Sequence, residues 1–165
     1  MKLPSFLAIV CLALSLSCLS GQEAAVAIKE PLAVLEGLSR EVLKDLRPGS
    51  NKMREAAGEA SKKAAESEGK QATFKIVIGN VDPFQAAEAP TVTRYKIGAR
   101  VETERVSGVP ISVHILAVLD IEQHPKVAKL KKGDKITITG RIGNAEVLGR
   151  TQAELHLDIK DVKLP

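Results

Sequence analysis

The side chains best suited to acid–base or metal chemistry in this 165-residue sequence are its three histidines, His114, His124 and His156. Their spacing matches no compact metal-binding motif. The sequence also contains no nucleophile elbow, no Walker glycine loop and no HExxH sequence. Catalysis is therefore unsupported by any motif, and we expect no catalytic residues and no cofactor.

Two of these histidines stand in alternating strand patterns beside acidic residues. His114 shares a face with Asp120. His156 points outward between Glu154 and Asp158. If the two strands were adjacent, a His/carboxylate group could form on one sheet face, as a metal-dependent hydrolase would require. We prefer the simpler interpretation that these are polar residues on a solvated face, and we predict no metal site.

One basic cluster, which we call the lysine segment (residues 126–135), is the other candidate for chemistry. Its members are Lys126, Lys129, Lys131, Lys132 and Lys135. They could bind a polyanion, either nucleic acid or an acidic glycan, at one end of a barrel. Basic charge without interleaved aromatic residues gives weak, salt-sensitive binding, so we prefer the interpretation as a solvated surface.

Aromatic residues are scarce, making up 2% of the chain, and Trp is absent. Single-stranded nucleic acid binding depends on base stacking worth roughly 1–3 kcal/mol per base. We therefore expect nucleic acid to be an unlikely partner, and the formal net charge of +4 does not demand one. The core must accordingly be built from Val, Ile, Leu and Ala.

Alternating apolar residues beyond position 72 predict five strands. The expected inward residues, strand by strand, are Phe74, Ile76 and Ile78; Tyr95, Ile97, Ala99 and Val101; Val113, Ile115, Ala117, Leu119 and Ile121; Ile136, Ile138 and Ile142; and Leu155, Leu157 and Ile159. Gly140 inside the fourth strand indicates a bulge or sharp bend. A short helical segment precedes that strand, and this order of elements is what an oligonucleotide/oligosaccharide-binding (OB) barrel requires.

Three features of residues 125–164 carry a resemblance to a known family. They are the amphipathic segment PKVAKL, the strand KKGDKITITG and a last strand that ends in alternating Leu and Asp. These residues resemble the closing half of an OB barrel, and more narrowly the bacterial tRNA-anti-like family. The resemblance implies an OB fold but not tRNA binding. By OB analogy a ligand would lie across the face of strands 2 and 3, within reach of Lys96, Arg100, Glu102 and His114.

Residues 1–20 are typical of a secretory signal peptide. Lys2 precedes a long apolar run, and small or polar residues follow it. Cys18 and Ser20 occupy the −3 and −1 positions for cleavage before Gly21. We expect export to the periplasm or the extracellular space, with no transmembrane span in the mature chain; a lipoprotein anchored through Cys18 is the alternative. Such cleavage would remove both cysteines of the sequence, which excludes thiol chemistry and Cys-based metal sites.

Residues 21–70 are predicted to form a helical extension. A first helix is expected from Pro31 to about Leu46, where the sequence RPGS ends it. We prefer packing against the barrel for this helix over binding to a partner or a membrane. The next stretch, residues 51–67, is rich in Ala, Lys and Glu. Because Met53 is its only large apolar residue, we expect a solvated helix or a frayed linker there.

The sequence as a whole predicts a mainly β fold, a five-stranded OB-like barrel preceded by an α-helical N-terminal extension. We divide it into a signal peptide (1–20), a helical extension or linker (21–70) and a barrel domain (71–165). The predicted function is an exported, non-catalytic binding module of the cell envelope with an unknown ligand or protein partner. Polyanion binding through the lysine segment, and a metal-dependent hydrolase using His114 and His156, are the alternatives.

Overall fold

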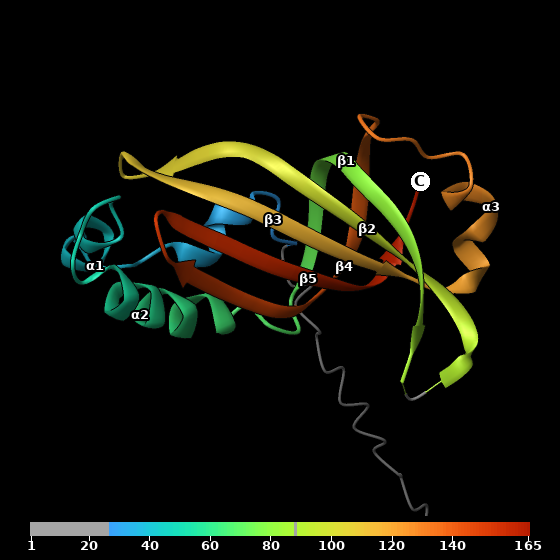
Figure 1. The fold of residues 1–165 in the computed structure, drawn as a ribbon, viewed down its shortest axis with the longest axis horizontal. Helices are drawn as coiled ribbons and strands as arrows, with labels where there is room; N and C mark the ends of the chain where they lie inside the picture. Colours follow the sequence, from blue (N-terminus) through green and yellow to red (C-terminus); the bar gives the residue numbers. More distant parts are fainter. Residues whose placement is uncertain (1–26, 88) are drawn as a thin grey trace, which may run out of the picture.

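Five strands with alternating buried and exposed side chains close into a barrel. The computed structural model describes residues 27–87 and 89–165, so the predicted signal peptide, with Cys18 and its cleavage site, lies outside the described residues. The strands are β1 (Gln71–Ala86), β2 (Ala89–Val106), β3 (Val109–Leu119), β4 (Lys135–Gly149) and β5 (Ala153–Lys163). They follow each other around the barrel in the order β1-β2-β3-β5-β4, and only the pair β3–β5 is parallel (Figure 1). The predicted mainly β, OB-like barrel is confirmed.

The barrel core is mainly aliphatic, with Phe74 as a buried aromatic residue, and it comes from all five strands, as the alternation predicts. Phe74 of β1 and Leu157 of β5, for example, are 0% and 1% exposed. The prediction fails at Ile121, which is 51% exposed. The reason is that β3 ends at Leu119 and the chain then turns into a short 3-10 helix, η2 (Ile121–Gln123), so the alternation of the strand no longer applies.

Irregularities in strand register and backbone conformation interrupt β4 and β5. The register between these strands shifts between Thr139 and Arg141, at the bulge that Gly140 predicts, and again between Ile142 and Asn144. A Cβ atom at Gly140 would lie 2.6 Å from the carbonyl oxygen of Lys160, so a larger residue would force the strands apart. In β5, Asp161 adopts a φ of 52°. This turn of the backbone changes the phase of the alternation, so that Val162 is buried.

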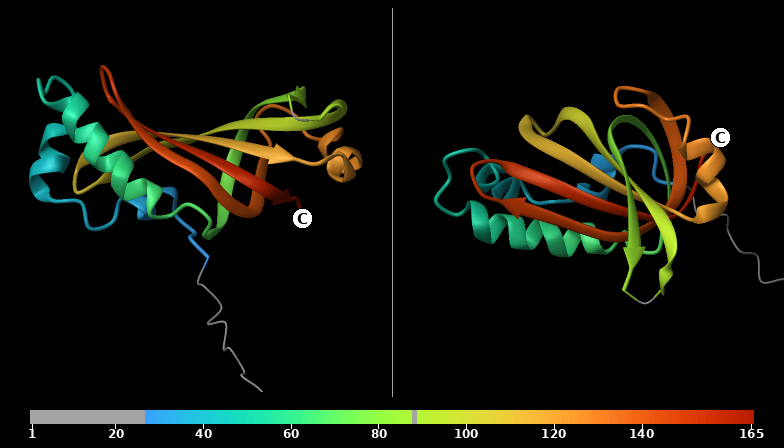
Figure 2. Two further views of the ribbon diagram at one scale, coloured as in Figure 1. Left: turned by 90° about the horizontal axis from the view of Figure 1, so that it is seen from below. Right: turned by 45° about the vertical axis from the view of Figure 1, so that its right-hand side comes forward.

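Helices lie at both ends of the elongated barrel (Figures 1 and 2). They are η1 (Pro31–Leu35), α1 (Arg40–Asp45) and α2 (Met53–Ala65) before the barrel, and α3 (His124–Val127) between β3 and β4. The single helix predicted from Pro31 to Leu46 is divided into η1 and α1. Gly37, with a φ of 84°, interrupts it, and the Ser39 hydroxyl caps the new helix by accepting a hydrogen bond from the N–H of Val42 at 3.2 Å.

The helix α2 packs beside β4 through a face made of alanines (Figure 2). Ala57, Ala60 and Ala64 are buried in this contact. The Ser61 hydroxyl donates to the carbonyl of Val147 at 3.0 Å and accepts from its N–H at 2.8 Å. The helix thereby satisfies backbone groups at an edge of β4. The prediction of a solvated helix or frayed linker is therefore wrong, because small side chains let a helix approach a strand closely.

Candidate functional site

Four polar side chains form a row across the outer face of the barrel. The strand register pairs Arg100 of β2 with His114 of β3. It pairs His156 of β5 with His114 on one side and with Glu146 of β4 on the other. The residues before and after each histidine are buried in the core, so both imidazoles point outward. The two histidine-bearing strands, whose adjacency the sequence left open, are direct neighbours.

A cavity of about 550 Å³ opens on this outer face. Strands β2, β3 and β5 contribute Arg100, His114, His156 and Asp158 to its lining, and the loop before β4 contributes Lys132. The volume falls within the range of roughly 300–1,000 Å³ that is usual for ligand sites. The cavity therefore joins one residue of the lysine segment to the outward residues of three strands.

Lys132 reaches the cavity because its loop is tied to β1. The N–H of Gly133 donates to the carbonyl of Ile78 at 2.8 Å, and the N–H of Ile78 donates to the carbonyl of Asp134 at 3.0 Å. Gly133 adopts a φ of 91°, which a turn of this kind needs and glycine tolerates. The loop is thus held beside the barrel wall, next to the outer face.

The β1 side of the cavity depends on a glycine in β2. A Cβ atom at Gly98 would lie 2.1 Å from Oδ1 of Asn80, whose side chain lies over that position. The Asn80 amide is oriented by donating a hydrogen bond to the Asp82 carboxylate. Ile78 is the last inward residue predicted for the first strand, but β1 continues to Ala86 after a register shift between Ile78 and Asn80. The contribution of Asn80 was missed for this reason.

His114, His156 and Glu154 form a compact cluster beside the cavity. The two imidazole rings stack with centroids 4.8 Å apart and planes inclined by 16°. Glu154 Oε2 lies 3.4 Å from Nε2 of His156. One ligand atom from each of the three residues lies within 4.8 Å of the others, and in the described part of the chain no other group of His, Cys, Asp or Glu is arranged in this way.

The surroundings shift the protonation of this cluster. Partial burial lowers the pKa of His114 below its usual value, and the neighbouring His156 and Arg100 lower it further. Burial acts to raise the pKa of Glu154, but hydrogen bonds with His156 and Gln152 outweigh it and bring the pKa below its usual value. At neutral pH the His114 imidazole is therefore neutral and Glu154 is ionised.

The pKa of Asp158, on the cavity wall, is shifted in the opposite direction from that of Glu154. Burial raises the pKa of its carboxyl group, although nearby cations oppose this, led by Lys160. Its negative charge is therefore less favoured than that of an exposed carboxylate. Because Arg100 and Lys132 line the same cavity, the lining favours an anionic or oxygen-rich ligand.

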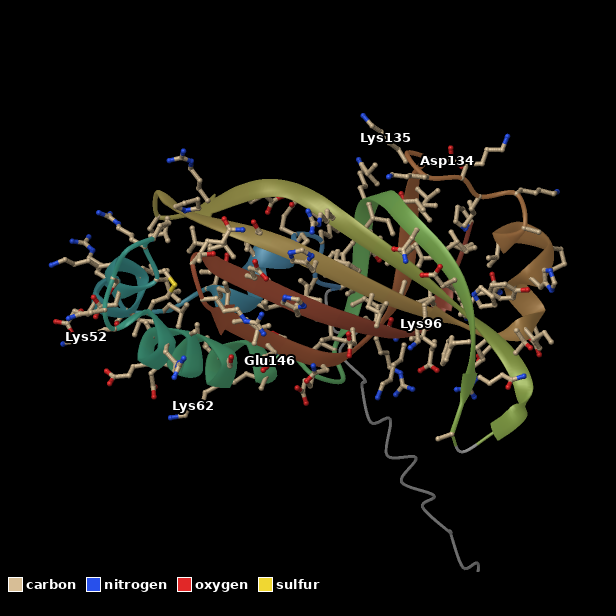
Figure 3. All side chains as sticks on the ribbon, viewed as in Figure 1. Lys52, Lys62, Lys96, Asp134, Lys135 and Glu146 are labelled. Carbon is tan, nitrogen blue, oxygen red and sulfur yellow. The ribbon has the colours of Figure 1, made fainter. Side chains whose placement is uncertain are left out.

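The four residues predicted on the face of strands 2 and 3 are only partly brought together. Arg100 and His114 line the cavity. Lys96 lies farther along β2 (Figure 3), where its Nζ is 4.2 Å from the centroid of the Phe84 ring. The side chain of Glu102 lies outside the described part of the structure.

The members of the lysine segment have different surroundings. Lys132 lines the cavity, whereas Lys135 borders a second cavity of about 460 Å³ and points away from the barrel (Figure 3). Lys126 Nζ donates to a backbone carbonyl near the C-terminal end of the chain at 2.8 Å. Lys129 and Lys131 are exposed to solvent. Of the lysine segment, Lys132 is the member that lines the cavity beside Arg100.

Comparisons with known proteins yield remote structural similarities. No family model and no curated protein matches the chain. A proposed nucleic acid-binding lipoprotein from Klebsiella pneumoniae is similar with 16% identity and a TM-score of 0.44, over 64% of this chain and 77% of that chain. The SSB domain of a Synechococcus sp. protein has 9% identity and a TM-score of 0.35, over 56% of this chain and 91% of that chain. The small single-stranded DNA-binding protein from Streptomyces coelicolor has 14% identity and a TM-score of 0.33, over 58% of this chain and 91% of that chain.

The expectation that nucleic acid is an unlikely partner is wrong. The similar structures are a proposed nucleic acid-binding lipoprotein, an SSB domain and a single-stranded DNA-binding protein. The scarcity of aromatic residues argues only against base stacking, whereas Lys and Arg side chains also bind the phosphate backbone. Arg100 and Lys132 line one cavity, so cations for such contacts are present.

In the part of the chain that the structure describes, no helix is long and apolar enough to cross a membrane. The predicted signal peptide itself precedes the described residues, so export stays a prediction from the sequence.

Proposed function

We propose that this protein is an exported, non-catalytic OB-fold binding module of the cell envelope, whose ligand occupies the cavity on the outer face of β2, β3 and β5. The cavity of about 550 Å³ carries this proposal. Its position agrees with the general use of OB folds, which bind ligands across strands 2 and 3 and the adjoining loops. The lining comes from strands β1, β2, β3 and β5 and from the tied loop of Lys132, so the site is largely preformed.

The side chains around the cavity suit ligand binding. Among the described residues that line it, none offers a hydroxyl or thiol nucleophile. His114 and His156 stack on each other rather than pairing with such a group. Asn80, Arg100 and Lys132 are hydrogen-bond donors, which suit a ligand rich in oxygen atoms.

Polyanion binding is a second candidate function, with single-stranded nucleic acid or an acidic glycan as the ligand. The observation in its favour is that Arg100 and Lys132, which belong to the two separate sets predicted from sequence, line the same cavity. Binding that neutralises phosphate or carboxylate groups with such side chains weakens as salt rises, because counterions are released. Salt dependence therefore separates this candidate from a neutral ligand.

We also propose that the chain belongs to the bacterial tRNA-anti-like OB family and that residues 1–20 direct its export. The motif KKGDKITITG, which covers the turn before β4 and the first part of that strand, and the pattern of residues 1–20 support these two proposals. The intact mass of the protein recovered from the periplasm of an expressing bacterium tests the second one. A chain beginning at Gly21 is expected, lipidation at Cys18 would indicate a lipoprotein, and an unprocessed cytoplasmic chain would contradict export.

Chemical-shift mapping tests the position of the binding site. The ¹⁵N-labelled protein is titrated with an oligothymidylate of about 12 nucleotides and, separately, with an oligogalacturonate as the acidic glycan. We expect shifts to concentrate at Gly98, Arg100, His114 and His156. Shifts confined to α2, or to the exposed part of the lysine segment, would contradict the proposed site. Absence of saturable shifts with both probes would rule out the polyanion candidate.

A pair of variants tests the chemistry of the cavity. Lys62 projects from α2 away from the barrel (Figure 3), and its Nζ lies 2.7 Å from Glu59, so Lys62→Ala is a matched control for loss of charge. Arg100→Ala is expected to weaken oligothymidylate binding about fivefold and to reduce the salt dependence by about 0.7 in log–log slope. Equal losses in both variants would indicate diffuse attraction to the whole surface instead of a site.

A further inference from the structure

We propose that His114, His156 and Glu154 bind a divalent transition-metal ion on the outer face of the barrel, with Cu²⁺ bound more tightly than Zn²⁺. This proposal replaces the sequence-based expectation of no metal site. It goes beyond the proposed binding function and does not depend on it, because the metal site is defined by three side chains of this chain alone.

The backbone brings these three side chains together. His114 and His156 are direct partners in the parallel pair β3–β5, so their side chains leave the sheet side by side. Glu154 precedes His156 by two residues and therefore lies on the same face of β5. Strands of a closed barrel hold these positions more firmly than a loop would.

The spacing of the ligand atoms is close to what an ion needs. They lie within 4.8 Å of one another. Zn²⁺ with bond lengths of about 2.0–2.2 Å in a tetrahedral site requires ligand atoms roughly 3.3 Å apart. Because the His156 and Glu154 side chains are 38% and 32% exposed, rotation about their side-chain bonds can close the remaining gap without disturbing the core.

The donor set indicates which ions fit. Two imidazoles and one carboxylate suit Zn²⁺, Cu²⁺, Ni²⁺ and Co²⁺, and the general order of affinity places Cu²⁺ first. Mg²⁺ and Ca²⁺ prefer oxygen ligands throughout and are not expected to bind here. Three protein ligands also leave one coordination position open, as in metal sites that hold water or a second ligand. The cavity lined by His114 and His156 provides room for it.

Calorimetric titration with the metal salts alone is the first test. The full chain is used without a polyhistidine tag, and with Cys11→Ser and Cys18→Ser so that thiolates cannot bind the metal. One Cu²⁺ or Zn²⁺ per chain is expected, with Cu²⁺ tighter, and no saturable binding of Mg²⁺. His114→Ala and His156→Ala should each weaken Zn²⁺ binding by about 100-fold or more, because even a lost outer-shell partner costs about 10–100-fold.

His124 provides a matched control. It is the third histidine of the sequence, and its ring nitrogens lie 3.3 Å from the Tyr95 hydroxyl, apart from the cluster. His124→Ala is therefore expected to bind the metal as the parent does. An equal loss of affinity in this variant, or retained affinity in the double variant His114→Ala/His156→Ala, would overturn the proposal, as would the absence of stoichiometric binding by the parent.

Two further measurements separate loss of a ligand from loss of the fold. Glu154→Gln keeps the shape of the side chain, and it should fold as the parent does and bind Zn²⁺ more weakly. The electron paramagnetic resonance spectrum of the Cu²⁺-loaded parent should show coupling to imidazole nitrogens. A spectrum without this coupling would contradict ligation by the cluster. So would an unchanged spectrum of the His156→Ala variant, provided that its circular dichroism shows the parental fold.

Discussion

On the outer face of β2, β3 and β5, residues distant in the sequence lie together, whereas in the lysine segment residues close in the sequence lie in different surroundings. Arg100, His114 and His156 are distant in the sequence, yet strand register makes them neighbours. Lys132 and Lys135 are close in the sequence, yet they border different cavities. Paired strands align distant residues in rows, whereas a turn points successive side chains in different directions. Outward positions on paired strands therefore locate a site better than a cluster of charges does.

The largest expected effect is on the free energy of unfolding, when a core residue beneath the row of outward polar side chains is truncated. Leu157 is buried in the core between the outward residues His156 and Asp158. Leu157→Ala is expected to lower the free energy of unfolding by about 3 kcal/mol, through lost burial and a cavity in the core. Ile121→Ala, at a position 51% exposed, should change it by less than about 0.5 kcal/mol. Urea denaturation of both variants measures the difference, and comparable values would contradict the assigned core.

A smaller effect is expected at the close approach of β1 and β2. Gly98→Ala places a methyl group against Asn80, and we expect a loss of about 1.5 kcal/mol from the displacement this forces. In the background Asn80→Ala, the same change should cost less than about 0.5 kcal/mol, because the displaced side chain is gone. A double-mutant cycle by denaturation checks this coupling. Additive effects would show that the two residues do not meet at the cavity edge.

The contrast within the lysine segment can be tested directly. Lys132→Ala is expected to weaken oligothymidylate binding about threefold to fivefold, whereas Lys129→Ala should change it by less than about twofold, since an exposed cation outside the site contributes little. Fluorescence anisotropy at moderate salt measures both affinities. If the two variants behaved alike, the segment would act as a single basic surface, and Lys132 would have no special role in binding.

The smallest expected effect is at Glu104, which lines the second cavity together with Lys135. Burial raises the pKa of its carboxyl group, and the nearby Glu30 adds to this. The protonated form of Glu104 is therefore more favoured in the folded protein than in the unfolded chain. The free energy of unfolding decreases as the pH rises from the ordinary pKa of a glutamate through the raised pKa of Glu104. Glu104→Gln should stabilise the protein by about 0.5 kcal/mol at neutral pH and by almost nothing at acid pH. Denaturation at several pH values tests this, and a gain that grows toward acid pH would contradict it.

Much of the barrel could be predicted from the sequence, because alternation along a strand is a local property. The inward positions of β1 and β5 and the bulge at Gly140 followed from residue type and spacing alone. Predictions failed where an element ended without a strong local signal, as at Ile121, or where small residues hid a buried face. The alanines of α2 carry little hydrophobic signal, and their burial depends on the approach of β4.

Only part of the candidate site could be predicted from the sequence in the same way. Sequence alone determined that His114 and His156 point outward from strands, that Glu154 shares a face with His156, and that no catalytic motif accompanies them. Only the tertiary structure decided that β3 and β5 are parallel neighbours in this register, and that Lys132 joins Arg100 at one cavity. The physical reason is that side-chain alternation is a property of the local backbone, whereas the register between distant strands follows from closure of the whole barrel.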